Sequence, residues 1–359
     1  MLVTPTEGDG ARQPGIILAA MDKFRGTASA RDLNDTVARV AGEHGHDVDL
    51  QLVSDGGEGF IDAFPGDVVT LEVPGALSHP VEARIKVDVS SGTRRAVLEV
   101  ADVVGRNLRG NPSGADALAA TSDGVGHLIL AAVRMGANSV LVGCGDTATS
   151  DAGLGCYQVL SDAGGVPVPV TAATDVTARF SGALRYAVQK GVDPGDLGLV
   201  EHRFSVARAR YLDERGVDVE ALERTGAAGG LSGALVALGA YLTSGFDAVA
   251  GSVELLGRVE RASLVVTGEG RLDLGSLEGK VAVGLATMTD RRSDLLVVCG
   301  AVDHEARRLF LERFPRAALV SLEDRFGVER SSSMVLECLA IVVRDHLEHR
   351  AHLTARSPD

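Results

Sequence analysis

The chain has 359 residues, 45% of them hydrophobic and 23% charged, which excludes wholesale disorder and favours two domains. With 35 Lys and Arg against 49 Asp and Glu, the net charge of −14 argues against binding to nucleic acid or to an acidic membrane surface. The four cysteines form no CxxC pair, and no apolar run approaches the ~20 residues of a membrane-spanning helix. We therefore expect a soluble cytoplasmic protein that binds a small molecule.

The first part of the chain alternates short strands with helices. Residues 1–14 are polar and predict a disordered tail. Residues 16–20 (IILAA) are typical of a strand buried on both faces, and Ser29 with Asp32 offers a capping box for the helix that follows. A second strand is predicted at residues 49–53.

From residue 68 the pattern changes. Residues 81–89 and 95–100 alternate around Ser90-Ser91-Gly92, which indicates a hairpin, so we place a domain boundary near residue 67. An apolar stripe predicts a helix after Thr121, a strand is predicted at 139–143, and 230–242 reads as a buried helix. Residues 166–225 carry too weak a pattern for a detailed prediction.

The last hundred residues return to short apolar strands between amphipathic helices, which predicts a parallel sheet covered on both faces. Strands are expected at 263–267, 295–299 and 317–322, and helices at 280–288, 305–314 and 332–349. The predicted fold class is α/β: a discontinuous Rossmann-like or flavodoxin-like parallel-sheet domain with a second α/β domain inserted and a cleft between them. The expected bounds are 15–66 with 256–359 for the first domain and 67–255 for the inserted one.

Several predicted strands end in loops that combine glycine with an acidic residue, at 22–26, 55–59, 143–153 and 268–273. Ligands of open α/β sheets bind at this edge, where free N–H groups and helix N-termini attract anions. Carboxylates there can hold Mg²⁺ or accept a proton from a hydroxyl group. The pattern favours metal-dependent phosphoryl transfer; the alternative for each loop is a tight turn with an acidic helix cap. A G-x-G-x-x-A match at 143–148 leaves a nicotinamide oxidoreductase as a distant alternative.

Residues 268–273 (GEGRLD), followed by 279–284 (GKVAVG), closely resemble a segment of the bacterial glycerate kinase family. Three further blocks resemble that family in the same order: DGGEG at 55–59, TSDGVGHLI at 121–129 and GAAGG at 226–230. The resemblance, to a divergent member of the glycerate 2-kinase type, implies ATP- and Mg²⁺-dependent phosphorylation of D-glycerate to 2-phosphoglycerate in a cleft between two α/β domains.

The sequence departs from the family pattern at four positions: Arg25 replaces a lysine, Asp146 a glycine, Ser150 an asparagine and Gly275 a glutamine. Arginine keeps the charge but replaces a compact ammonium with a planar fork. Asp146 adds a negative charge where a phosphate or carboxylate could approach. Weaker echoes of family segments occur at 174–180 and 188–191.

The candidate site residues fall into three groups. For catalysis we expect Arg25 and Lys280 to neutralise phosphate charge and Asp22 or Asp151 to accept the hydroxyl proton. For binding of substrate or phosphate we expect Gly56, Gly57, Glu58, Gly145, Asp146, Thr147, Ser150, Gly229, Gly268 and Arg271. For Mg²⁺ we expect Asp55, Glu269 and Asp273.

Two alternatives remain open. One is the same reaction on a different acceptor, such as a sugar or cyclitol without a carboxylate, because Asp146 would accept hydrogen bonds from neutral hydroxyls and repel glycerate. The other is a degenerate homologue that binds ligand without catalysis, for which Arg25 and Ser150 are the support. The sequence also leaves a homodimer open.

Overall fold

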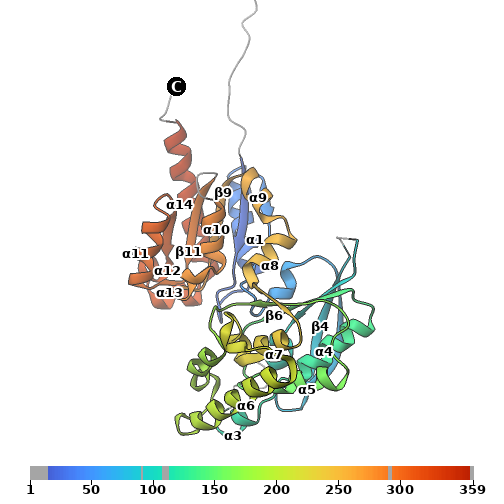
Figure 1. Ribbon diagram of the computed structural model, residues 1–359. Coiled ribbons are helices and arrows are strands. Elements are labelled where there is room, and N and C mark those ends of the chain that lie inside the picture. Colours follow the sequence, from blue (N-terminus) through green and yellow to red (C-terminus); the bar gives the residue numbers. More distant parts are fainter. Residues whose placement is uncertain (1–14, 90–91, 107–112, 290–292, 356–359) are drawn as a thin grey trace, which may run out of the picture.

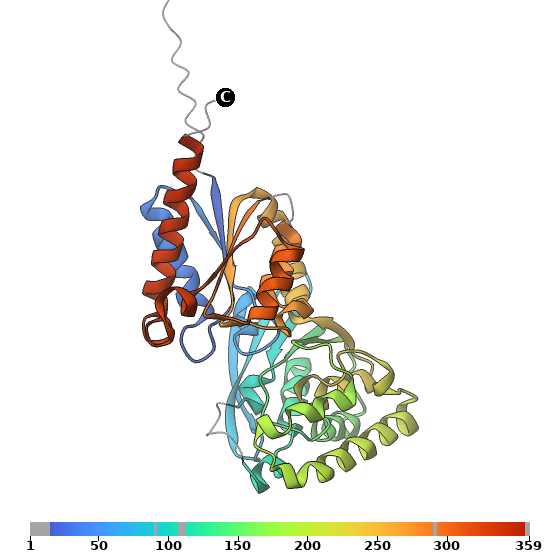
Figure 2. The ribbon, with the colours of Figure 1, turned by 90° about the vertical axis from the view of Figure 1, so that its left-hand side faces the viewer.

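The structure, a computed structural model, describes residues 15–89, 92–106, 113–289 and 293–355. They form two lobes, one carrying the C-terminal helix and the other formed by the middle of the chain (Figures 1 and 2). The predicted tail at 1–14 and the hairpin tip at Ser90-Ser91 lie outside the described residues.

The first lobe is built on a five-stranded sheet in the order β13-β11-β9-β1-β2, in which every neighbouring pair is parallel. The strands are β1 (Ile16–Met21), β2 (Val48–Leu50), β9 (Ala262–Gly268), β11 (Asp294–Cys299) and β13 (Ala318–Ser321). The predicted α/β class with a Rossmann-like sheet is confirmed. β2 is shorter than predicted, because Leu52 and Val53 leave the sheet and are buried in the core beside it.

Helices cover both faces of this sheet, as its short apolar strands require. One face carries α1 (Ala30–Glu43) and α14 (Val335–Ala355), which lie side by side in Figure 2. The other face carries α8 (Gly245–Ser252), α9 (Leu255–Arg261), α10 (Val281–Thr289) and α11 (His304–Arg313). Two short helices, α12 (Leu322–Phe326) and α13 (Val328–Ser333), precede α14, and β10 (Arg271–Leu272) pairs with β12 (Ala301–Val302).

The predicted serine cap of α1 is present: Ser29 Oγ donates to Asp32 Oδ2 at 2.6 Å and accepts the Asp32 N–H at 3.1 Å. We expect Ser29→Ala to lower the free energy of unfolding by about 1 kcal/mol, because this N–H loses its acceptor. Urea unfolding measures the change. Ser333→Ala, which removes a hydroxyl bonded only within α13, is the matched control and should stay within about 0.5 kcal/mol. Equal losses in both variants would contradict the capping role.

The second lobe is built on a six-stranded mixed sheet in the order β3-β4-β5-β6-β7-β8. The β3-β4 and β4-β5 pairs are antiparallel, which confirms the predicted hairpin, and the pairs from β5 to β8 are parallel. The strands are β3 (Asp67–Pro74), β4 (Pro80–Asp88), β5 (Arg95–Glu99), β6 (Ser139–Cys144), β7 (Val170–Thr174) and β8 (Tyr241–Ser244). The helix predicted at 230–242 ends early, because Gly239 turns the chain at a φ of 94° and β8 follows.

One face of the second sheet packs against α2 (Ala101–Val104), α4 (Asp123–Arg134), α5 (Leu154–Asp162) and α7 (Leu231–Ala237). Beyond them lie α3 (Ala115–Ala119) and α6 (Leu197–Arg215). Short 3₁₀ segments occur at Phe60–Ala63, Phe180–Tyr186, Val188–Lys190, Pro194–Asp196, Val219–Ala221, Ala227–Gly230 and Ser276–Glu278. The opposite face places Val97, Leu141 and Ala173 in the same buried cluster as Phe60 and Val249, so the two lobes share part of one core.

The division into 15–66 with 256–359 and 67–255 remains an interpretation. Because α8 packs with the first sheet, we propose that the second boundary lies nearer Gly245 than residue 256. Among the described residues, no helix combines the length and apolarity needed to span a membrane.

Candidate active site

The candidate site lies where strands β1 and β9 end. Asn34 of α1 fixes the end of β1: its side-chain oxygen accepts the Met21 N–H at 3.0 Å, and its side-chain nitrogen donates to the Met21 carbonyl at 3.1 Å. The next residue, Asp22, donates its backbone N–H to the Gly268 carbonyl at 3.0 Å. These bonds hold Asp22 beside the loop that begins at Glu269.

Two cavities open at this edge and share Arg25 and Lys280. The inter-lobe cavity, of about 640 Å³, is lined by both lobes, and its charged residues are Arg25, Arg106, Asp146, Asp175, Arg185, Lys190, Asp273, Glu278 and Lys280. The first-lobe cavity, of about 400 Å³, is lined by residues that include Asp22, Lys23, Asp55, Glu269 and Arg271. Both volumes are in the range of small-molecule sites.

Opposite charges are closely placed in the first-lobe cavity. Lys280 Nζ lies 3.3 Å from Asp55 Oδ2. Burial acts to raise the pKa of Asp55, but Lys23, Lys280 and the Gly57 N–H lower that pKa below its ordinary value, so the carboxylate is ionised. Burial, with the neighbouring charge of Asp55, raises the pKa of Asp22 to about 6. Asp22 is therefore mostly ionised at neutral pH and still able to take a proton.

Glu269 differs from these two carboxylates. It is only 8% exposed; Ser276 Oγ donates to its Oε2 at 2.7 Å, and its Oε1 has no hydrogen-bond partner among the described residues. Burial raises the pKa of Glu269 to about 8, so this side chain is largely neutral at pH 7 when no cation is bound. Burial alone would lower the pKa of Lys280, but Asp55, Asp175 and Glu269 raise it above its ordinary value, which keeps Lys280 charged.

This raised pKa predicts a pH dependence of stability. Folded Glu269 keeps its proton up to about pH 8, whereas the unfolded side chain loses it near its ordinary pKa of 4.5. The free energy of unfolding should therefore fall as pH rises between these values, with a contribution from this residue of about 1.4 kcal/mol per pH unit. Urea unfolding of Glu269→Gln at pH 5 to 8, with a chelator present, should show a shallower decline than the parent chain. Identical slopes would contradict the assignment.

The loop at 55–59 does not offer free N–H groups to a phosphate, as the sequence led us to expect. The Gly56 and Gly57 N–H groups donate to Ser54 and Asp55 side-chain oxygens, at 3.3 and 3.2 Å. The Glu58 and Gly59 N–H groups donate to Asp146 Oδ2 and Glu99 Oε1, both at 2.9 Å. Protein carboxylates and a hydroxyl group thus accept from these four N–H groups, and phosphate binding by Gly56, Gly57 and Glu58 stays a prediction.

The glycines here serve close packing between the lobes. A Cβ atom on Gly57 would lie 2.4 Å from Asp146 Oδ2, and one on Gly145 would lie 2.6 Å from the Gly57 Cα. A Cβ atom on Gly245 would lie 1.9 Å from the Asp55 carbonyl oxygen. Side chains at Gly57 or Gly145 would push the first-lobe loop away from the second lobe, and one at Gly245 would push the same loop away from the start of α8.

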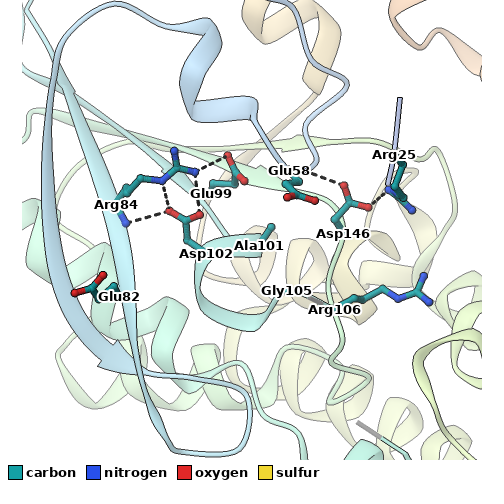
Figure 3. Close-up of a pocket in the computed structure, with 10 residues that line it drawn as sticks. All are labelled: Arg25, Glu58, Glu82, Arg84, Glu99, Ala101, Asp102, Gly105, Arg106 and Asp146. Atoms are coloured by element: carbon teal, nitrogen blue, oxygen red, sulfur yellow. Dashed lines mark hydrogen bonds and ion pairs between the residues drawn. The ribbon is translucent and has the colours of Figure 1, made fainter. Parts of the chain in front are cut away.

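Asp146, from the loop after β6, joins the lobes by its carboxylate. Its Oδ2 lies 3.3 Å from Lys23 Nζ and accepts the Glu58 N–H, and its Oδ1 pairs with the Arg25 guanidinium. Figure 3 shows the carboxylate of Asp146 between Glu58 and Arg25, with Arg106 below it in the view. The residues in Figure 3 line a cavity of about 320 Å³. Its lining also includes a second group of charged side chains, in which Arg84 Nε donates to Asp102 Oδ2 at 2.8 Å.

The glycerate kinase family's sequence profile matches residues 17–163 and 162–325. The chain belongs to the glycerate kinase family. The predicted resemblance is thus confirmed. A Mycobacterium bovis protein without an assigned function is 37% identical over 249 residues, which span 65% of this chain and 64% of that protein. The chain thus aligns with less than two thirds of the length of this relative.

Other members of the family align over more of the chain. Glycerate 2-kinase of Escherichia coli is 29% identical over 77% of this chain and 82% of its own, and glycerate kinase of Bacillus subtilis is 27% identical over 95% of each. A solved structure of a Salmonella typhimurium LT2 protein, provisionally named glycerate kinase 2, superposes with a TM-score of 0.70 at 24% identity. It covers 95% of this chain and 99% of its own, which supports the two-lobed fold.

Asp151 is the second residue predicted from the sequence of this glycerate kinase family member as a proton acceptor. In the structure its carboxylate accepts hydrogen bonds from three backbone N–H groups and one hydroxyl group. Its Oδ2 accepts from the Ser122 N–H and hydroxyl at 2.8 and 2.7 Å and from the Gly155 N–H at 3.2 Å, and its Oδ1 accepts the Gly153 N–H at 3.1 Å. It is 4% exposed and lines neither cavity. Its geometry fits a cap that connects α4 to α5. Of the two predicted bases only Asp22 lines one of these two cavities, and the role of base stays a prediction for both.

The other predicted residues divide between the cavities and the core. Gly145, Thr147, Gly229 and Asp273 line the inter-lobe cavity, Arg271 lines the first-lobe cavity, and Glu58 lines the cavity of Figure 3. Ser150 and Gly268 are buried; a Cβ on Gly268 would lie 1.7 Å from the Val298 carbonyl oxygen.

The three residues predicted for Mg²⁺ do not form one cluster. Asp273 Oδ1 accepts the Ser276 N–H at 3.0 Å, which caps the turn that follows, and it faces the inter-lobe cavity. Asp55 and Glu269 face the first-lobe cavity. In the described part of the chain, no group of three or more His, Cys, Asp or Glu side chains is arranged to hold a metal ion.

The predicted site residues omit five charged residues of the inter-lobe cavity, Arg106, Asp175, Arg185, Lys190 and Glu278, and two of these, Lys190 and Asp175, have shifted pKa values. Lys190 Nζ donates to Thr147 Oγ1 and to the Thr149 carbonyl, both at 2.9 Å, and burial lowers its pKa to about 8. Burial, with the charge of Asp55, raises the pKa of Asp175. Lys190 and Asp175 lie in segments that weakly resemble the family pattern, at 188–191 and 174–180. This resemblance was the sequence feature that could have identified them as site residues.

Proposed function

We propose that this chain transfers the γ-phosphoryl group of ATP to a hydroxyl group of D-glycerate or a related polyol, with Mg²⁺ as the cofactor. The observation that carries the proposal is the placement of Asp22, Asp55 and Lys280 on one cavity at the strand ends of the first lobe. Membership of the glycerate kinase family and the names of the Escherichia coli and Bacillus subtilis relatives support the choice of reaction and acceptor.

Each of the three side chains suits a role in phosphoryl transfer, which depends on positioning and on neutralising charge. Lys280 lies between the two cavities and stays charged, so it can pair with phosphate oxygens. Asp22, with a pKa of about 6, can accept the proton of the acceptor hydroxyl. Arg25 also borders both cavities and supplies a second positive charge.

The residues present fit Mg²⁺. This ion is usually held by one or two protein carboxylates together with substrate phosphates, so three converging protein ligands are not required. Asp55 is ionised, and the buried, unpartnered Oε1 of Glu269 is a donor atom that lacks a protein partner among the described residues. We therefore assign Asp55 and Glu269 to the metal. When bound, Mg²⁺ would neutralise charge on the phosphate oxygens.

The test is a measurement of ADP formation from ATP and Mg²⁺ with a panel of hydroxy acids, polyols, sugars and cyclitols. We expect acceptor-dependent ADP formation with D-glycerate or with a related uncharged polyol, and none when Mg²⁺ is removed by a chelator. A lack of ADP with every acceptor, together with a lack of ATP binding by calorimetry, would favour the degenerate ligand-binding homologue instead.

We also propose a cytoplasmic location. The support is that Cys144, Cys156, Cys299 and Cys338 are all buried and free, as in a reducing compartment. We also propose that the chain forms a homodimer. The molar mass in solution, measured by light scattering, tests this.

A further inference from the structure

The loop after β6 carries an unusual residue at the junction of the lobes. Asp146 has a φ of +56°, a backbone conformation that favours glycine and disfavours residues with a side chain. Its side chain is nevertheless only 12% exposed and points into the first lobe. The ion pairs and the hydrogen bond of this carboxylate can offset the cost of that backbone conformation.

Those contacts form a complete anion-binding set. The carboxylate meets the ammonium group of Lys23 at 3.3 Å, the guanidinium of Arg25, and the Glu58 N–H at 2.9 Å. Two cationic groups and a backbone N–H are the donors that proteins offer to a carboxylate or phosphate. Gly57 leaves room for it, since a Cβ there would lie 2.4 Å from Asp146 Oδ2. The protein thus satisfies these donors with its own carboxylate.

The two cationic residues of this anion-binding set lie on the walls of the candidate ligand cavities. Arg25 and Asp146 both line the inter-lobe cavity, and Arg25 borders the first-lobe cavity as well. Asp146 also offsets much of the positive charge on the inter-lobe wall, where cationic and acidic side chains are nearly balanced: Arg25, Arg106, Arg185, Lys190 and Lys280 against Asp146, Asp175, Asp273 and Glu278.

We propose that Asp146 is an internal anion that fills a carboxylate-binding subsite made by Lys23, Arg25 and the Glu58 N–H, and thereby selects an uncharged polyol over an acidic acceptor. The identification of the ligand as a phosphoryl acceptor rests on the proposed function. The existence of the subsite rests on the contacts alone. An acidic acceptor reaches the subsite only by displacing the Asp146 carboxylate. A neutral polyol leaves the ion pairs intact and can donate its hydroxyls to Asp146.

The test is calorimetric binding of D-glycerate and of glycerol, its uncharged counterpart with a hydroxymethyl group in place of the carboxylate. Asp146→Gly opens the subsite and relieves the positive φ, and Asp146→Asn keeps the shape but removes the charge. We expect the ratio of the Kd for D-glycerate to the Kd for glycerol to fall about tenfold or more in both variants. Asp345→Asn, which removes the partner of Arg325 on α14, is the matched control and should leave the ratio unchanged.

An unchanged ratio in either folded variant would overturn the proposal, and the melting temperature shows whether each variant is folded. The affinity for ATP is measured in parallel, because a nucleotide phosphate is the other anion that could use these donors. Tighter ATP binding without tighter D-glycerate binding would also overturn it. Binding is read without turnover, so a chain that forms no ADP with any acceptor would refute the proposed function and leave this comparison valid.

Discussion

Replacing Lys280 with methionine is expected to lower kcat/KM by a factor of about 10² to 10³. Lys280 borders both cavities and lies 3.3 Å from Asp55, and the surrounding carboxylates keep it charged. Methionine has a similar length and no charge, so the variant loses the cation proposed to stabilise the transferring phosphoryl group. Steady-state ADP formation measures the loss, which should appear mainly in kcat because the charge on the phosphoryl oxygens changes during transfer.

The variant also removes the ion-pair partner of Asp55, which keeps the Gly57 N–H and the charge of Lys23, so stability must be measured separately. Lys86→Met is the matched control: Lys86 is 9% exposed, and its Nζ donates to the Phe64 carbonyl at 2.9 Å, away from both cavities. We expect Lys86→Met to lower the melting temperature while the folded fraction keeps its kcat. If Lys280→Met retained kcat to within a factor of about three, the proposed role of Lys280 would be wrong.

Much of the first lobe was predictable because its elements carry local signals. β1, β9 and β11 are short apolar runs, and the helix after β1 starts at a serine cap that the structure reproduces. β8 was not predicted, because it has only four residues and Tyr241 among them is 71% exposed. Its sequence therefore lacks the run of apolar residues that marks a buried strand. α6 was missed for a related reason: its 19 residues bury only Val200, Phe204, Ala207 and Tyr211.

The candidate site was predictable as a set of loops but not as a set of contacts. The ordered motifs led to Asp55, Glu269 and Lys280, and these line one cavity. The partners of Asp146 and Asp151 could not be predicted, because each contact depends on tertiary packing. Asp146 reaches across 121 residues of sequence to Arg25, and Asp151 turns toward helix starts instead of the cavity.

Asp22→Asn is expected to lower kcat by a factor of about 10² to 10⁴, the range for loss of a general base. In the parent chain burial and the charge of Asp55 raise the pKa of Asp22 to about 6. A base acts only when ionised, so kcat/KM, which reports the pKa values of the free enzyme, should rise about tenfold per pH unit below pH 6 and level off above it. Asparagine cannot ionise, so the residual activity of the variant should lose this acid limb.

Asp151→Asn separates this effect from a general loss of structure, because Asp151 was the other candidate base predicted from the sequence. Its carboxylate accepts four hydrogen bonds at the starts of α4 and α5, so the substitution should lower the melting temperature. The folded Asp151→Asn enzyme should keep the limb near pH 6, since Asp22 is intact. If that limb instead vanished in Asp151→Asn and persisted in Asp22→Asn, the base would be Asp151, and its carboxylate would have to leave the backbone donors to reach the acceptor hydroxyl.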